Sequence, residues 1–142
     1  MIKIVIIILL GQFSLNGICR DKIVIGSKNF TESFILAQML ALLIEDSTNL
    51  KVEKKLGLGG TKVAFDALKN GAIDVYPDYS GTGYSMILKK KEILSPVDTY
   101  QIVKKEFTEK WGINWSKSLG FNNTYALAVR KNDARFEKKK KI

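Results

Sequence analysis

Three tyrosines lie in the stretch IDVYPDYSGTGYSMIL, residues 73–88, close to the point where a short apolar run ends at Pro77. Tyr76, Tyr79 and Tyr84 surround the junction between an expected strand and an expected helix. Converging tyrosine rings can bind a quaternary ammonium group, because their electron-rich faces attract a bulky, poorly hydrated cation. The same spacing also fits half-buried boundary residues with solvated hydroxyls, and that alternative stays open.

The 142 residues carry no recognisable enzyme signature. They contain no histidine and one cysteine, Cys19, which excludes histidine-based triads and histidine-ligated metal sites within this sequence. The segment LGLGGT (56–61) matches neither the P-loop nor the dinucleotide fingerprint, and it predicts a turn. Asp74 and Asp78 are close in sequence, but two carboxylates near a strand end do not by themselves indicate acid–base chemistry. We therefore expect no enzyme, no cofactor and no metal site.

The formal charge of +9 is concentrated at the two ends of the chain. Residues 1–20 contribute +2, and residues 130–142 contribute +5 from seven basic and two acidic side chains, which leaves +2 for residues 21–129. A nucleic-acid-binding protein needs a basic face on its folded body, so we expect no nucleic-acid partner. The run of four lysines at 138–141 predicts a disordered basic tail over residues 132–142.

The first twenty residues have the pattern of a secretory signal peptide. Lys3 gives a positive start, and the apolar run IVIIILL (4–10) is too short to span a bilayer. This pattern predicts export to the periplasm or to the outer face of the cytoplasmic membrane. Cys19 follows the run and suggests a lipid anchor, although Ile18 stands where lipoprotein processing usually has a small residue. A soluble exported protein is the alternative.

After residue 21, the expected strands and helices alternate. We expect strands at 22–26, 51–56, 72–77 and 122–131, and helices at 30–45, 62–71, 81–90 and 95–112. The alternation predicts an α/β fold with a mainly parallel sheet flanked by helices. The helix at 30–45 is apolar on most of its faces, so we expect it to be buried on more than one side.

Several polar residues are expected to cap these helices. Asn29 with Glu32, and Asp98 with Gln101, have the spacing of a capping box. Thr61 is a suitable N-cap for the helix at 62–71, and the glycine at 71 is a typical helix stop.

The tyrosine junction falls at the carboxyl end of the strand 72–77. Ligands of open α/β sheets bind beyond the carboxyl ends of the strands. If 122–131 is also a strand of this sheet, Tyr125 lies near the same edge as Tyr79.

Three motifs in this order resemble the substrate-binding component of ABC importers for osmoprotectants: GSKNFTESFILAQML, LGLGGTKVAFDALKNGAIDVYPDYSGTGY and LGFNNTYALAVR. These proteins bind glycine betaine, carnitine or choline. The resemblance runs from Lys22 to Lys131. It implies a periplasmic-binding-protein-like fold of type II, with residues 21–131 as the first lobe and the second lobe absent. It also implies a small quaternary ammonium ligand, permease and ATPase subunits as partners, and membrane association through the permease or a lipid anchor.

The resemblance also implies a set of ligand-binding residues. Tyr79 and Tyr125 correspond to tyrosines of the cage that surrounds the trimethylammonium head. Lys28 and Thr82 correspond to a lysine and a threonine that hold a ligand carboxylate in some relatives. Lys28 follows a strand near an expected helix N-terminus, a place that favours an anion. The other two tyrosines of the stretch are expected to be packing residues.

The sequence departs from this family in length, because the relatives continue into a second lobe that completes the cage. We expect a truncated or frameshifted product that binds its ligand very weakly alone. The alternative is a half-protein that works with a second polypeptide. A different interpretation is a basic exported surface or membrane-associated protein without transport activity.

Overall fold

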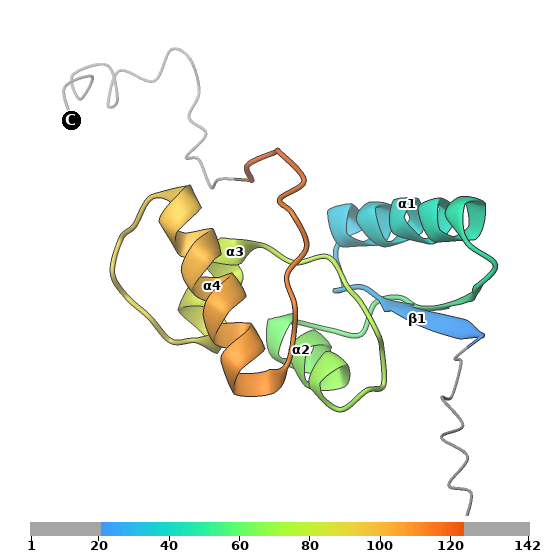
Figure 1. The fold of residues 1–142 in the computed structure, drawn as a ribbon, viewed down its shortest axis with the longest axis horizontal. Helices are drawn as coiled ribbons and strands as arrows, with labels where there is room; N and C mark the ends of the chain where they lie inside the picture. Colours follow the sequence, from blue (N-terminus) through green and yellow to red (C-terminus); the bar gives the residue numbers. More distant parts are fainter. Residues whose placement is uncertain (1–20, 124–142) are drawn as a thin grey trace, which may run out of the picture.

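The computed structural model describes residues 21–123 of the chain. Its elements, drawn in Figure 1, are β1 (Lys22–Gly26), α1 (Thr31–Ser47), β2 (Lys51–Lys55), α2 (Thr61–Lys69), α3 (Ser80–Thr82), the π-helix η1 (Gly83–Ile87) and α4 (Pro96–Trp111). The predicted signal peptide with Cys19, the basic tail and nearly all of the predicted strand at 122–131 lie outside the described residues. Residues 122 and 123 have no regular secondary structure.

The sheet is parallel, as the alternation of elements predicts. β1 pairs with β2 in the register Lys22↔Lys51 to Gly26↔Lys55. On the other side of β1, Ile25 forms a parallel bridge with Val75, and the Gly26 backbone N–H donates to the Val75 carbonyl at 2.8 Å. The lateral order is therefore β2, β1, Val75.

The predicted strand at 72–77 is wrong in extent, because only Val75 forms a bridge. The Asp74 carboxylate accepts a hydrogen bond from the Val24 backbone N–H at 2.7 Å. This β1 donor therefore bonds to a side chain and not to a backbone carbonyl of the expected strand. Pro77 has no N–H to donate to a ladder. The expected strand is thus reduced to a single bridging residue, Val75, with Asp74 before it and Pro77 two residues after it.

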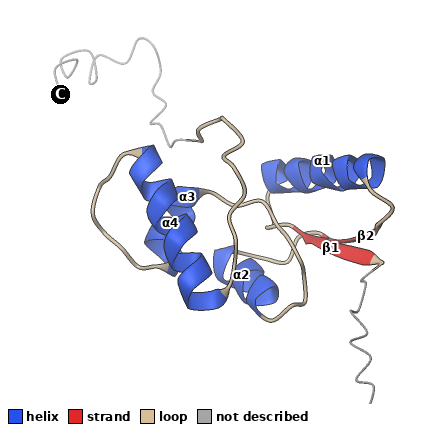
Figure 2. Cartoon of the chain, viewed as in Figure 1, coloured by secondary structure: helices blue, strands red, loops and turns tan. Residues whose placement is uncertain are grey.

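Helix α1 lies along one face of the two strands (Figure 2). Ala37 and Ala41 are fully buried and pack with Ile25 of β1, because their short side chains let the helix approach the sheet closely. The expectation that α1 is buried on several sides is wrong within residues 21–123. Four large apolar side chains of α1 are between 54% and 65% exposed: Ile35, Met39, Leu42 and Leu43.

A second apolar core joins α2, η1 and α4. Phe65, Tyr84, Val103 and Phe107 are buried together, and the Phe65 and Phe107 rings meet edge to face with centroids 5.6 Å apart. Tyr84 is therefore a packing residue, as expected. A side chain at Gly83 would lie 3.0 Å from the Trp115 ring, so the glycine permits close contact between η1 and the segment after α4.

The predicted helix caps are wrong for α1 and α2. Their N-cap residues are Phe30 and Gly60, and neither forms a side-chain cap hydrogen bond. Thr61 is the first residue of α2 rather than its cap. The Glu32 carboxylate, expected to close a capping box, instead accepts a hydrogen bond from the distant Asn123 amide at 2.8 Å.

Helix α4 begins three residues before the predicted cap. Ser95 is the N-cap, with Pro96 at the first helical position, and its hydroxyl accepts a hydrogen bond from the Asp98 backbone N–H at 3.1 Å. The Ser95 hydroxyl also donates to the Asp98 carboxylate at 2.6 Å. Asp98 therefore stands at the third helical position. The glycine stop at 71 is confirmed, with φ of +70° in the left-handed region.

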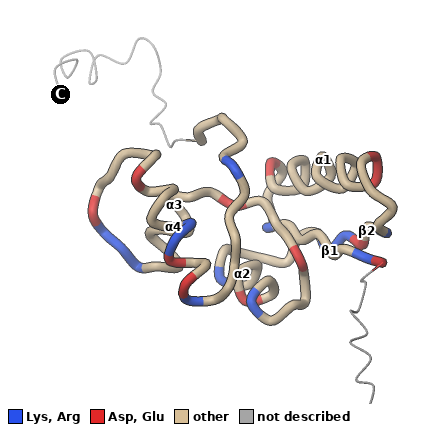
Figure 3. Tube along the Cα trace, viewed as in Figure 1, with Lys and Arg blue, Asp and Glu red and all other residues tan. Residues whose placement is uncertain are grey.

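Charged residues are distributed along the described chain, with basic and acidic segments interspersed (Figure 3). Several of them form ion pairs on the surface, for example Lys90 with Glu106 at 2.7 Å. The hydrogen bonds from Lys110 and Lys90 lower the pKa of the Glu106 carboxyl. Exposed pairs of this kind contribute little to stability.

Two valines of α4 test the position of the second core, because Val103 is fully buried and Val97 is 67% exposed. We expect Val103→Ala to lower the free energy of unfolding by about 2 kcal/mol, from the lost burial of two methyl groups and the cavity they leave. Val97→Ala should change it by less than about 0.5 kcal/mol. Urea unfolding followed by circular dichroism measures both, and equal losses would contradict the assignment of this core.

Candidate functional site

A hollow of about 850 Å³ lies beyond the carboxyl end of β1. Its lining comes from the loop after β1, the start of α2, the loop of residues 76–79 (the tyrosine loop) with α3, the start of α4, and the segment that follows α4 across the molecule. Lys28, Tyr79 and Thr82, three of the four residues that the sequence predicts to bind ligand, line this one hollow. The fourth, Tyr125, lies outside the described residues.

Lys28 forms a buried ion pair with Asp78. Its Nζ lies 2.5 Å from the Asp78 Oδ1, and the two side chains are only 5% and 4% exposed. The same ammonium lies 5.5 Å from the ring centroid of Phe30 and 5.8 Å from that of Tyr79. Lys28 therefore contacts a carboxylate and two rings of the protein itself, and its expected contact with a ligand carboxylate stays a prediction.

Asp78 is a residue of the site that the sequence analysis set aside. Besides the lysine, its carboxylate accepts hydrogen bonds from the Tyr76 hydroxyl at 3.0 Å and from the Tyr79 backbone N–H at 2.8 Å. Burial, with the added effect of the Asp78 charge and hydrogen bond, raises the pKa of the Tyr76 hydroxyl. No local sequence signal links Asp78 to Lys28, which is 50 residues away.

Tyr79 stands at the junction of the tyrosine loop and α3. Its hydroxyl accepts a hydrogen bond from the Asn123 amide at 3.1 Å, and its ring meets the Phe121 ring edge to face with centroids 6.4 Å apart. Partial burial, and then a hydrogen bond to Glu32, raise the pKa of the Tyr79 hydroxyl. The ring is therefore held from two sides by residues that lie near it only in the folded chain.

The other aromatic side chains of the hollow were not predicted from the sequence. Phe30, Tyr100 and Phe121 contribute to its lining. Two of them belong to motifs that the sequence analysis quoted, SKNFTE and GFNNTY, but their place beside Tyr79 depends on the fold. Rings together with the Glu32 carboxylate make a surface suited to a cation, because ring faces and carboxylates both attract positive charge.

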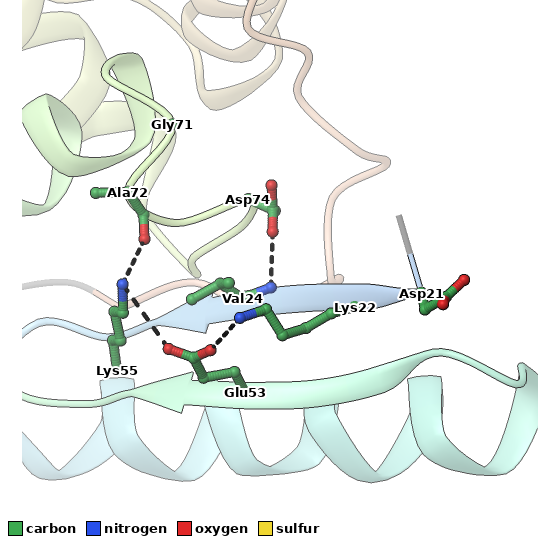
Figure 4. A pocket seen from close by; sticks show the side chains of 8 residues that line it. All are labelled: Asp21, Lys22, Val24, Glu53, Lys55, Gly71, Ala72 and Asp74. Carbon is green, nitrogen blue, oxygen red and sulfur yellow. Dashed lines mark hydrogen bonds and ion pairs between the residues drawn. The ribbon is translucent and has the colours of Figure 1, made fainter. Parts of the chain in front are cut away.

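A smaller pocket, of about 380 Å³, lies between the two strands and residues 71–74, on the face of the strands opposite α1 (Figure 4). Its charged groups hold neighbouring segments together. The Lys22 Nζ lies 2.6 Å from the Glu53 Oε2 across the two strands, and the Lys55 Nζ donates to the Ala72 carbonyl at 3.0 Å. The hydrogen bond from Lys22 lowers the pKa of the Glu53 carboxyl. These contacts give the pocket a structural role.

Residues 21–123 contain no histidine or cysteine, and their acidic side chains include no group of three or more placed to hold a metal ion. None of the helices in this range has both the length and the apolar character needed to cross a membrane.

The parallel strands flanked by helices form part of a type II periplasmic-binding-protein-like fold. A crystal structure of a glycine betaine/carnitine/choline ABC transporter superposes on this chain with a TM-score of 0.64 and 31% sequence identity. The superposition covers 74% of this chain and 39% of the other. The predicted fold class is confirmed.

The family of the chain follows from its sequence. The model of the family described as the substrate-binding domain of the ABC-type glycine betaine transport system matches residues 21–142, and the chain belongs to this family. The resemblance predicted from the three motifs is thereby confirmed. The family consists of transport proteins rather than of an enzyme class.

Two curated relatives show how much of such a protein is present. The chain is 39% identical over 122 residues to the carnitine transport binding protein OpuCC of Listeria monocytogenes, with 85% of this chain and 40% of the relative covered. It is 35% identical over 120 residues to the ergothioneine transport permease/ergothioneine binding protein EgtU of Helicobacter pylori, with 84% and 21% covered. The chain thus spans less than half the length of the curated relatives it matches.

The buried Tyr76 hydroxyl gives a testable dependence of stability on pH. Because its pKa is raised in the folded state, Tyr76 keeps its proton after the tyrosines of the unfolded chain ionise near pH 10, and its contribution to stability is lost as the pH rises above that value. We expect the difference in unfolding free energy between wild type and Tyr76→Phe to be constant from pH 7 to about pH 9 and to shift against wild type at about pH 11. Urea unfolding at these pH values measures it. A difference that stays constant over the whole range would contradict a raised pKa.

Proposed function

We propose that this chain forms the first lobe of the solute-binding component of an ABC importer for quaternary ammonium osmoprotectants, such as glycine betaine, choline or carnitine. The observation that carries the proposal is the aromatic hollow at the carboxyl end of β1, where Tyr79 lies with Phe30 and Phe121. Membership of the glycine betaine family and similarity to the carnitine transport binding protein of Listeria monocytogenes support it.

In this proposal Tyr79 provides one wall of a cage for the cationic head. Each ring in contact with such a cation contributes roughly 0.5–2 kcal/mol, so one tyrosine is not enough for tight binding. Tyr125, from the motif NNTYALAV, contributes a second ring, and the Thr82 hydroxyl contributes a polar contact beside the cage. One lobe contacts the ligand from one side only, so a lobe by itself binds weakly.

The proposal also covers the place of the protein in the cell. Residues 1–20 act as a signal peptide, and residues 132–142 form a basic tail outside the lobe. Binding takes place outside the cytoplasm, in the periplasm or at the outer face of the cytoplasmic membrane, where the permease of an importer receives the ligand and its ATPase subunits drive transport. Cys19 supplies a lipid anchor if it is processed as a lipoprotein cysteine.

A titration of the full chain with choline tests the cage. We expect Tyr79→Ala to weaken choline binding by about tenfold, which corresponds to the loss of one strong cation–ring contact. Tyr79→Phe keeps the ring and should lose much less, since it removes only the hydroxyl bonded to Asn123. NMR chemical-shift titration into the millimolar range measures the affinities.

The neutral isostere 3,3-dimethylbutan-1-ol is the control ligand, because it has the shape of choline without the charge. It should bind more weakly than choline to wild type, and Tyr79→Ala should affect it less. Equal binding of the two ligands would show that the hollow selects for apolar shape and not for a cation.

A further inference from the structure

We propose that Lys28 is a positioning residue, which acts through Asp78 to hold Tyr79 in place, and that it is not a binding residue for a ligand carboxylate. This proposal rests on the proposed function for its ligands. It also specifies which end of the ligand the lobe binds. The lobe contacts the cationic head, and Lys28 does not distinguish choline from glycine betaine.

The Lys28 ammonium is already paired with a carboxylate of the protein itself. The Nζ–Oδ1 distance to Asp78 is 2.5 Å, and both side chains are more than nine-tenths buried. A ligand carboxylate that recruited this ammonium would leave the Asp78 charge buried without its partner. Breaking a buried ion pair on one side is among the most costly changes in a protein interior, so the exchange is strongly unfavourable.

Asp78 connects Lys28 directly to Tyr79. The oxygen that pairs with Lys28 also accepts the Tyr79 backbone N–H at 2.8 Å, while the other carboxylate oxygen accepts the Tyr76 hydroxyl at 3.0 Å. The carboxylate is thus fixed on both sides of Pro77, and it fixes the backbone from which the Tyr79 side chain projects. The Lys28 ammonium also lies 5.8 Å from the centroid of the Tyr79 ring.

The charge that remains at the hollow is negative. Once Lys28 and Asp78 neutralise each other, the charged side chain left on the described lining is Glu32, whose carboxylate accepts the Asn123 amide at 2.8 Å. A carboxylate at this wall attracts a trimethylammonium group and repels a ligand carboxylate. The described lobe therefore offers more to the cationic end of a ligand than to an anionic end.

Three variants of the full chain separate positioning from direct binding. Lys28→Met removes the ammonium and keeps the length of the side chain, Asp78→Asn removes the charge of the partner, and the double variant removes both charges. Lys62 and Asp66 give a matched control pair, because they form an ion pair of 2.7 Å on α2 whose lysine is 83% exposed. Lys62→Met and Asp66→Asn should leave ligand affinity and the Tyr79 ring signals unchanged.

The first measurement needs no ligand. In chains carrying ¹³C-labelled tyrosine, we expect Lys28→Met and Asp78→Asn each to shift the ring signals of Tyr79, and the double variant to return them part of the way. The partial return follows because the double variant leaves no buried charge unpaired. Unchanged Tyr79 signals in folded Lys28→Met would overturn the proposal.

The second measurement compares choline with glycine betaine, which share the cationic head and differ in the carboxylate. We expect Lys28→Met to weaken both ligands by the same factor, about tenfold, because a displaced Tyr79 ring costs each of them the same contact. A loss confined to glycine betaine would assign Lys28 to the carboxylate and overturn the proposal. If Lys28→Met does not fold, the double variant decides through the ligands, because a loss confined to glycine betaine would again assign Lys28 to the carboxylate and overturn the proposal.

The two proposals can fail separately. If wild type binds neither choline nor glycine betaine in the millimolar range, the proposed function fails for this chain, and the ring signals still decide the role of Lys28. If both ligands bind and Lys28→Met weakens only glycine betaine, the function stands and the positioning role fails.

Discussion

The buried ion pair between Lys28 and Asp78 is the contact on which the candidate site depends. It joins the loop after β1 to the tyrosine loop, two segments that are 50 residues apart in the sequence. Desolvation makes such a pair costly to form and much more costly to break from one side, so it acts mainly as a constraint on geometry. The Asp78 carboxylate also accepts hydrogen bonds from the Tyr76 hydroxyl and the Tyr79 backbone N–H. These bonds fix the backbone position from which the Tyr79 side chain projects.

The parallel sheet brings the partners of this ion pair to one place. The register of β1 and β2, and the bridge from Ile25 to Val75, put the end of β1 beside the start of the tyrosine loop. Gly26 is needed at this crossing, because a side chain there would come within 2.5 Å of the Ile73 side chain. The hollow therefore forms where the chain leaves two adjacent parallel segments, the usual place for a ligand in an open α/β sheet.

The opposite wall of the hollow rests on the helical core. Phe65, Tyr84, Val103 and Phe107 hold η1 and α4 together, and the Trp115 ring packs against Phe107 with centroids 5.4 Å apart. That contact fixes the start of the segment that returns across the molecule to Phe121 and Asn123. Because the site combines elements of the sheet and of this helical core, its aromatic side chains converge although they lie far apart in the sequence.

The sequence by itself determined most of the regular elements and the family. The apolar run of β1, the glycines around α2 and the pattern of α4 are local signals, and three motifs identified the family. They also led to Lys28, Tyr79 and Thr82, which line one hollow. Tertiary structure decided the rest, because it depends on contacts between distant residues. The Asp74 carboxylate accepts the Val24 backbone N–H, so the expected strand is reduced to a bridge. The Glu32 carboxylate bonds to Asn123 instead of capping α1, and Lys28 pairs with Asp78. No local pattern encodes these pairings.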